Sequence, residues 1–203
     1  AYMGSLKNEE TAVLLTLGTG VGGGLIIGGK VYSGKNGVAS ELGHMVVGDN
    51  FYDCNCGRNG CLETYSSATG VIKYAIKVVS EADVSKTDSK FVLEFVDKTS
   101  TIKCKDVFDY AKDGDKLAKS IVDRMVKYLV RGIVNLVVTL DVEKVAIGGG
   151  VAAAGLYLID LIESELEHER IFRNIKAPSV VLATMGNDAG VIGAALIEKF
   201  TIK

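Results

Sequence analysis

The chain has 203 residues, of which 48% are apolar and 24% charged, and its formal net charge at pH 7 is −2. This composition is enough to bury a sizeable core and excludes a disordered chain, and the absence of a Lys/Arg block leaves no electrostatic footprint for nucleic-acid binding. No uninterrupted apolar run reaches the roughly 20 residues of a membrane-spanning helix, and no secretory signal is visible, so we expect a cytoplasmic protein without a membrane partner.

The first predicted elements form an antiparallel ribbon. Thr11–Leu17 is a short β-prone run, and a glycine-rich stretch follows it. Gly28 and Gly29 lie between two apolar stretches and predict a two-residue hairpin turn, because such turns need positive φ. Residues 33–61 show little periodicity, and we expect a long irregular segment, which at that length is usually functional or cross-linked.

The rest of the chain alternates between helical and strand patterns. Apolar periodicity predicts helices over 62–81 and 115–139, with two short helices between them at "FVLEFVDK" and "KDVFDYAKDG". "EKVAIGGG" predicts a buried strand and glycine turn before the helix "GLYLIDLIESELEHE", "SVVLAT" a further strand, and "DAGVIGAALIEKF" a final helix. Short apolar strands between helices indicate a single α/β domain with parallel strand pairing.

Three of the four cysteines lie in the eight residues "CNCGRNGC". Cys54, Cys56 and Cys61 are too closely spaced for comfortable disulfides, so reduced thiols or metal binding are favoured. Three thiolates need a fourth ligand for tetrahedral zinc, and His44 lies ten residues before Cys54. The sequence favours a closed, structural Cys3His zinc site, with free thiols as the alternative. Cys104 is expected in the core or at its boundary.

Two glycine-rich motifs are candidates for nucleotide binding. "LGTGVGGG" joins two strands and so fits neither a P-loop nor a Rossmann motif, but its backbone N–H groups and its threonine can face an anion. "IGGGVAAAG" lies between a strand and a helix, where open α/β sheets bind ligands. The alternatives are a tight hairpin for the first and close helix–strand packing for the second. Two such motifs in one chain favour a nucleotide.

Two glutamates, Glu41 and Glu63, flank the predicted zinc site. Surface glutamates are usually solvated, and that alternative stays open for each of them. A metal that fixes both loops would also fix both carboxylates. Carboxylates held in this way can accept bidentate hydrogen bonds from the hydroxyl groups of a sugar.

Five stretches match one known family, in the family's own order. They are "LTLGTGVGGGLIIGGKVYSGKNGVASELGHMVVG", "CNCGRNGCLE", "AKDGDKLAKSIVDRMVKYLVRGIVNLV", "VAIGGGVAAAG" and "GNDAGVIGAAL". This pattern resembles the ROK sugar kinases (repressor, open reading frame, kinase), and within them most closely the bacterial glucokinases. The resemblance covers nearly the whole chain and is much more specific than any one motif.

The resemblance implies the actin-like, ribonuclease-H-like ATPase fold, with a mixed sheet, antiparallel opening hairpins and flanking helices. Two lobes of this fold close over ATP, Mg²⁺ and a hexose. By the same resemblance, Gly18, Thr19 and Gly20 contact the ATP phosphates, and Gly149 and Gly150 line the adenosine pocket.

The resemblance also assigns a sugar clamp and a metal site. Glu41, His44 and Glu63 would hold the sugar hydroxyls. The family's structural zinc ligands correspond to His44, Cys54, Cys56 and Cys61. A dual role of the histidine is physically reasonable, because one ring nitrogen can bind zinc while the other faces the sugar.

Family members also have an N-terminal lobe with a D-x-G-G-T strand and the general-base aspartate, which have no counterpart in this sequence. We therefore expect residues 1–203 to be the C-terminal, large lobe of a two-lobe sugar kinase, without a catalytic residue of its own. The implied parent activity is ATP-dependent phosphorylation of glucose at its 6-hydroxyl. The alternatives are a kinase for fructose, mannose, allose or an N-acetylhexosamine, and a sugar-responsive repressor. The family commonly forms homodimers through this lobe.

Overall fold

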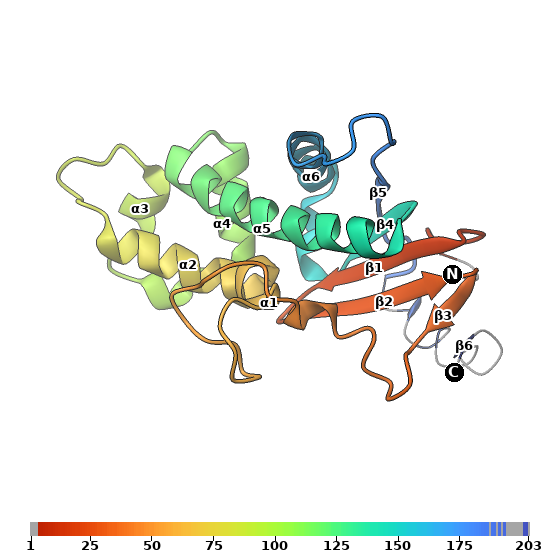
Figure 1. The fold of residues 1–203 in the computed structure, drawn as a ribbon. Helices are drawn as coiled ribbons and strands as arrows, with labels where there is room; N and C mark the ends of the chain where they lie inside the picture. The colour runs from red at the N-terminus through yellow and green to blue at the C-terminus, as the bar shows by residue number, and fades with distance from the viewer. Residues whose placement is uncertain (1–3, 187, 190, 192, 194–200, 203) are drawn as a thin grey trace.

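Figure 1 shows the computed structural model, which describes residues 4–186, 188, 189, 191, 193, 201 and 202. Its sheet has six strands in the order β5-β4-β1-β2-β3-β6. The strands are β1 (Thr11–Leu17), β2 (Val21–Ile27), β3 (Lys30–Tyr32), β4 (Lys144–Gly148), β5 (Ser179–Leu182) and β6 (Thr201–Ile202). β2 pairs antiparallel with β1 and β3, whereas β1–β4, β4–β5 and β3–β6 are parallel. The expected mixed sheet with antiparallel opening hairpins is confirmed.

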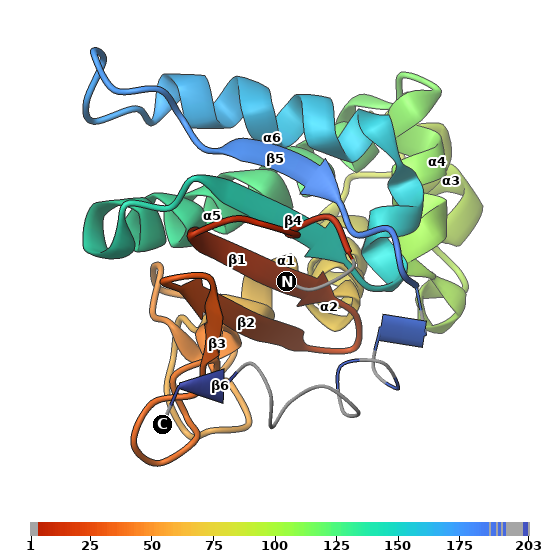
Figure 2. The same cartoon turned by 90° about the vertical axis from the view of Figure 1, so that its right-hand side faces the viewer.

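Six α-helices and three 3-10 helices are described beside the sheet. The α-helices are α1 (Glu63–Ser66), α2 (Ala68–Glu81), α3 (Lys90–Phe95), α4 (Cys104–Lys112), α5 (Lys116–Leu140) and α6 (Leu156–His168). The 3-10 helices are η1 (Leu42–His44), η2 (Thr99–Thr101) and η3 (Gly150–Ala154). Figure 1 shows that α5 runs from the group of α2, α3 and α4 towards the sheet, and Figure 2 shows α6 alongside β5. Alternate residues of β1 (Val13, Leu15 and Leu17) join these helices in one buried core.

The hairpin predicted at Gly28 and Gly29 is confirmed. Their φ angles are 58° and 71°, and the flanking residues Ile27 and Lys30 are paired across the turn. Two consecutive positive φ angles describe a primed turn, whose twist matches that of the strands it joins. Glycine adopts this conformation without the steric cost that a Cβ would bring.

The single helix predicted over 62–81 is wrong in one respect, because the chain breaks at Ser67 into α1 and α2. Ser67 has extended backbone angles, and its hydroxyl accepts a hydrogen bond of 2.9 Å from the N–H of Gly70. Serine is a favoured N-cap residue because its side chain satisfies an N–H group that has no partner within the helix. The apolar periodicity continues across the break and therefore hides it.

Two further predictions concern the second half of the chain. The turn after β4 leads into α6 through the 3-10 helix η3 rather than directly. The predicted final helix, 188–200, falls mainly on residues outside those that the structure describes. Within the described residues, no helix combines the length and apolar character that crossing a bilayer requires.

Asp115 is the N-cap of the long helix α5, and its carboxylate also reaches the start of α3. Its carboxylate accepts hydrogen bonds from the N–H groups of Leu117 and Ala118 in α5, and from the Ser89 hydroxyl and Phe91 N–H at the start of α3. Burial alone would raise the pKa of Asp115, but these hydrogen bonds outweigh it, so the pKa lies below its ordinary value. One carboxylate therefore holds two helix N-termini together.

We expect Asp115→Ala to lower the free energy of unfolding by about 2–3 kcal/mol at pH 7, because the α5 cap and the hydrogen bonds to Ser89 and Phe91 at the start of α3 are lost. The folded-state pKa is depressed, so the wild-type advantage is complete above the unfolded-state pKa of about 3.9 and is lost as the pH falls through the folded-state value. Urea unfolding between pH 7 and pH 3 measures this difference. The exposed Asp97→Ala is the matched control, and an equal, pH-independent loss in both variants would contradict the capping role.

Candidate functional site

The irregular segment predicted over 33–61 folds back onto the start of β2. It contains η1 and two isolated β-bridges, Val46 with Cys61 and Asp53 with Asn59. The Leu62 N–H donates to the carbonyl of Met45 at 2.8 Å, which closes the segment just before α1. This bond links the residue after η1 to the residue before α1, and the predicted sugar-binding carboxylates lie at the N-terminal ends of these two helices: Glu41 precedes η1 and Glu63 begins α1.

A cavity of about 370 Å³ lies where this segment meets the β1–β2 turn. Seven of the eight residues predicted to bind sugar or nucleotide line this cavity: Gly18, Thr19, Gly20, Glu41, His44, Glu63 and Gly149. The eighth, Gly150, follows Gly149 directly and begins η3 without lining the cavity. The predicted phosphate loop, sugar clamp and second glycine motif thus meet at one place.

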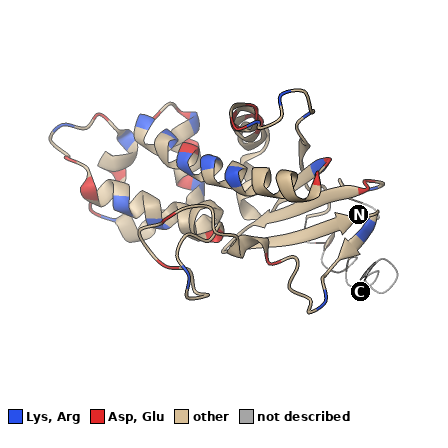
Figure 3. Cartoon of the chain, viewed as in Figure 1, with Lys and Arg blue, Asp and Glu red and all other residues tan. Residues whose placement is uncertain are grey.

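Neither β1 nor β2 carries a charged residue, and both are tan in Figure 3. The ionisable groups of the cavity lining are therefore Glu41, His44 and Glu63. The two carboxylates lie on either side of the imidazole: Nε2 is 3.9 Å from Oε2 of Glu41, and Nδ1 is 3.8 Å from Oε1 of Glu63. Three polar groups therefore converge beside an uncharged glycine wall.

The glycines of the β1–β2 turn leave room for Glu63. A Cβ added to Gly20 would lie 2.8 Å from Oε2 of Glu63. The turn is tied to the same region through its backbone, because the N–H of Ala68 donates to the carbonyl of Gly18 at 2.8 Å. Gly149 packs tightly against β1, because a Cβ there would lie 2.5 Å from the carbonyl oxygen of Leu17. A side chain at Gly20 would displace the Glu63 carboxylate, and one at Gly149 would push against the backbone of β1.

Sequence reasoning missed Thr16, which also lines the cavity. It is paired with Gly22 across the β1–β2 ladder, and a Cβ at Gly22 would lie 2.6 Å from the Thr16 hydroxyl oxygen. The alternation of side chains along the strand could have identified it. Thr16 and Leu14 share the face of β1 opposite to the buried Leu15 and Leu17.

The four predicted metal ligands come together in space. Their ligand atoms, from His44, Cys54, Cys56 and Cys61, all lie within 4.8 Å of one another. The Sγ atoms of Cys56 and Cys61 are 3.6 Å apart, and Sγ of Cys54 is 3.5 Å from Nδ1 of His44. Zinc with Zn–S of about 2.3 Å and Zn–N of about 2.05 Å has tetrahedral edges of about 3.8 Å (S to S) and about 3.5 Å (S to N). The donor set and its spacing therefore fit a tetrahedral zinc ion.

The three thiols differ in their environment. Burial raises the pKa of Cys54 to about 12, and it also raises the pKa of Cys61. The backbone N–H of Arg58 lowers the pKa of the exposed Cys56 to about 6. The S–H of Cys54 donates to Oε1 of Glu63 at 2.8 Å, so the cysteine group and the cavity are in direct contact. Metal binding at such a site displaces the thiol protons.

The fourth cysteine, Cys104, begins α4 and is half-buried against the core, as expected. Burial raises the pKa of its thiol to about 12. Cys104 is not one of the four residues grouped around the candidate metal site. It therefore serves as an internal control for metal binding.

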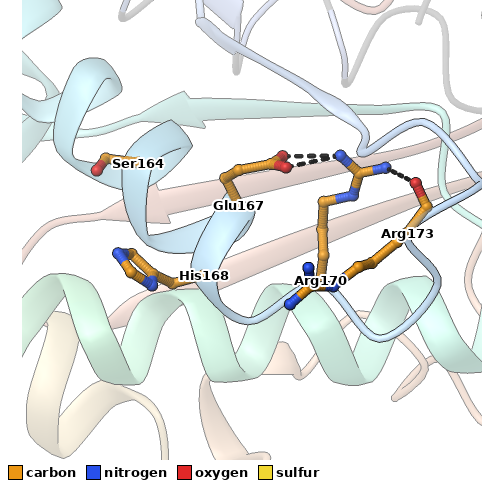
Figure 4. A pocket seen from close by; sticks show the side chains of 5 residues that line it. All are labelled: Ser164, Glu167, His168, Arg170 and Arg173. Carbon is orange, nitrogen blue, oxygen red and sulfur yellow. Dashed lines mark hydrogen bonds and ion pairs between the residues drawn. The ribbon is translucent and has the colours of Figure 1, made fainter.

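A second cavity, of about 690 Å³, lies at the end of α6 (Figure 4). Its prominent side chain, Arg170, binds both carboxylate oxygens of Glu167 at 2.8 and 2.9 Å. The same guanidinium donates to the carbonyls of Arg173 and Ile175 at 2.6 and 2.8 Å. Arg170 thus closes the turn after α6, and this cavity contains none of the predicted binding residues.

Comparison of the fold with solved structures indicates the class of protein. The sheet and its helices match solved sugar kinases of the actin-like ATPase fold. A glucokinase from Streptomyces griseus, solved in complex with glucose and AMPPNP, gives a TM-score of 0.79 at 30% identity over 93% of this chain and 60% of that chain. A ROK family transcriptional regulator, a homologue of the E. coli MLC protein, gives 0.76 at 26% identity over 97% of this chain and 48% of that one.

Sequence comparison identifies the family. The model of the ROK family matches residues 1–200, and the chain belongs to this family. It is 40% identical to a glucokinase of Halalkalibacterium halodurans over 98% of this chain, and 34% identical to an N-acetylmannosamine kinase of Haemophilus influenzae over 94% of it. The chain spans 59% and 56% of the lengths of these two relatives.

We expect the purified chain to contain about one zinc ion and to lose it when a ligand cysteine is removed. A closed metal site cross-links residues 44–61, so chelation should lower the free energy of unfolding by at least about 2 kcal/mol. For a chain of this length, that loss lowers Tm by about 4–8 °C. Elemental mass spectrometry and thermal melts with and without chelator measure both effects.

Two cysteine variants provide the contrast. Cys56→Ser should abolish zinc binding and the response to chelator, whereas Cys104→Ser should retain both. Metal-free wild type with the same Tm in chelator would refute the metal site, and so would zinc that survives Cys56→Ser at full occupancy.

Proposed function

We propose that this chain is the C-terminal, large lobe of a two-lobe kinase that transfers the γ-phosphoryl group of ATP to the 6-hydroxyl of glucose. The observation that carries this proposal is the single cavity that gathers the β1–β2 glycine turn, Gly149 and the Glu41–His44–Glu63 group. The family membership and the glucokinase relatives agree with it. Because the chain spans little more than half of those relatives, the activity is proposed for the longer protein.

On this proposal, the glycine turn receives the phosphates of ATP. Thr19 and Gly20 offer backbone N–H groups and one hydroxyl, while the N–H of Gly18 donates to the carbonyl of Gly20 at 2.9 Å and shapes the turn. Such an uncharged wall can approach an anion closely. Gly149 and Gly150, at the carboxyl end of β4, form the side against which adenosine lies. Mg²⁺, when bound with ATP, neutralises charge that develops on the transferred group.

The polar side of the same cavity receives the sugar. Glu41 and Glu63 accept hydrogen bonds from hydroxyl groups, and charged acceptors make the stronger hydrogen bonds. His44 directs Nδ1 towards Cys54 and Nε2 towards Glu41, which allows it to bind zinc on one side and face the sugar on the other. In this proposal zinc is structural: it fixes the segment that carries the clamp.

The contribution of this lobe to the rate is positioning. Phosphoryl transfer gains most of its acceleration from alignment of the two substrates and from electrostatic stabilisation. The proton of the sugar hydroxyl goes to an aspartate that the family resemblance places in the other lobe. The lobe described here should therefore bind glucose weakly and, on its own, turn over almost no ATP with it.

A repressor is the second candidate, because one structural match is a transcriptional regulator. The intact glycine turn with Thr19, and its position opposite Gly149, favour a nucleotide site and hence a kinase. An N-acetylhexosamine is the second candidate substrate, because some relatives of the chain are N-acetylmannosamine kinases.

The assay that tests the function compares glucose with N-acetylmannosamine, mannose and fructose in the full-length protein with ATP and Mg²⁺. We expect glucose to have the highest kcat/KM and Glu63→Gln to lower it about 10–100-fold, the equivalent of one charge-assisted hydrogen bond. Glu163→Gln, on the exposed side of α6, is the control and should have no effect. A higher kcat/KM for another sugar would refute glucose as the substrate, and absence of any sugar phosphorylation would refute the kinase activity. Substantial turnover by residues 1–203 alone would refute the division of the active site between two lobes.

Gly20→Ala tests the contact between the glycine turn and the sugar clamp. The new Cβ meets only the end of a flexible side chain, so we expect stability to change by less than about 1 kcal/mol while the Glu63 carboxylate is displaced. The KM for glucose should rise about tenfold, as expected for one weakened charged hydrogen bond. Gly24→Ala is the matched control on β2, because its Cβ would make an ordinary contact of 3.6 Å with Leu14. Equal KM values for glucose in both variants would contradict the role of Glu63.

A further inference from the structure

We propose that Arg124 of α5 is a positioning residue for the sugar clamp, acting from outside the cavity. It does not line the cavity, yet it contacts both the segment before the cysteine group and the helix that begins with Glu63. Only the part of the proposal that concerns sugar binding rests on the proposed function. The geometric part concerns how residues 48–66 are held and stands on contacts within this chain.

The guanidinium of Arg124 lies among three tyrosine rings. Its Cζ atom is 4.1 Å from the ring centroid of Tyr74, 4.6 Å from that of Tyr65 and 5.4 Å from that of Tyr128. These rings belong to α2, α1 and α5, so one cation joins three helices. Cations placed over aromatic faces at these distances are attracted to the rings, more strongly when water is excluded.

The same guanidinium fixes the loop that leads into the cysteine group. Its Nη2 atom donates to Oδ1 of Asn50 at 2.8 Å. Asn50 in turn donates through Nδ2 to the carbonyl of Thr64 at 3.0 Å, and its backbone N–H donates to Oδ1 of Asn59 at 2.7 Å. The hydroxyl of Tyr52 donates to the same Thr64 carbonyl at 2.7 Å. Arg124 thus reaches, through one asparagine, both sides of the cysteine-bearing loop and the residue next to Glu63.

Helix α1 needs these contacts because it has a single turn of four residues. One turn fixes several backbone angles for very few hydrogen bonds and does not stabilise itself. Its orientation therefore comes from Tyr65, which is fully buried and stacked on Tyr128 at a centroid distance of 3.8 Å, and from Ser66, whose hydroxyl donates to the carbonyl of Met125 at 3.1 Å. Glu63 begins this turn, so the direction of its carboxylate depends on how Tyr65 is held.

Arginine suits this position better than lysine. Its planar guanidinium stacks on rings with its face while its edge donates hydrogen bonds in fixed directions, whereas an ammonium group is a compact point charge. Arg131, seven residues further along α5, provides a natural comparison. It lies over Tyr128 at 5.0 Å but makes no hydrogen bond to residues 48–66 among the contacts described. Lys and Arg recur along this helix in Figure 3.

The experiment compares Arg124→Met with Arg131→Met, and uses Arg124→Lys to test partial rescue. In the purified chain, hydrogen–deuterium exchange over residues 48–66 should become about tenfold faster in Arg124→Met, should be intermediate in Arg124→Lys and should stay unchanged in Arg131→Met. In the full-length protein, Arg124→Met should raise the KM for glucose about tenfold and change kcat and the KM for ATP less than twofold, as loss of sugar positioning predicts.

Equal exchange and equal KM values for glucose in Arg124→Met and Arg131→Met would overturn the inference. An equal fall in kcat with every sugar and an unchanged KM would also overturn it, because that pattern indicates a general loss of structure. If Arg124→Met does not fold, Asn50→Ala replaces it: it removes the link to the loop and retains the tyrosine rings, and unchanged exchange there would overturn the inference. If exchange is faster in Arg124→Met but the full-length wild-type protein phosphorylates no sugar, the proposed function fails while the positioning role of Arg124 stands.

Discussion

Close contact between two backbones, with no side chain between them, places Glu41 and His44 beside the β1–β2 turn. A Cβ at Gly43 in η1 would lie 2.1 Å from the carbonyl oxygen of Val21, and one at Gly23 would lie 2.4 Å from the carbonyl oxygen of Ser40. Both distances are far inside van der Waals contact, and a clash with the backbone is not relieved by changing a rotamer. Only glycine at these two positions lets η1 lie directly on β2. Glu41 and His44, at the two ends of η1, are placed beside the β1–β2 turn as a consequence.

The segment that follows η1 has little regular structure and is restrained from two sides. On one side, the thiols and the imidazole form a group that fits zinc, and one of them contacts Glu63. On the other side, Arg124 and its tyrosines hold Asn50 and α1. Ordering each residue of such a segment costs roughly 1–2 kcal/mol of conformational entropy, so several strong local restraints are required. The two groups act at different points of the loop, and together they determine the direction of the Glu63 carboxylate.

Much of this arrangement is legible in the sequence, because it depends on local patterns. The positive φ angles at Gly28 and Gly29, the apolar stripe of α5 and the spacing of the four candidate metal ligands each follow from residue type and separation. The break at Ser67 is local too, but the apolar period continues through it and masks the cap. Contacts between distant residues are different in kind. The sequence around Arg124 does not predict that its partner is Asn50, 74 positions earlier, because that pairing depends on how α1, α2 and α5 pack.

The carboxylates of the cavity also bear on which part of the protein supplies the general base. Glu41 and Glu63 are the carboxylates that line it, and each has an oxygen within 4 Å of a ring nitrogen of His44. A general base must reach the proton that it removes, and its pKa must suit that transfer. Carboxylates already engaged on either side of an imidazole are arranged to accept fixed hydrogen bonds, which is the task of a clamp. Under the proposed function, these groups would orient the sugar beside the glycine turn, and the base would come from the opposite side of the bound sugar.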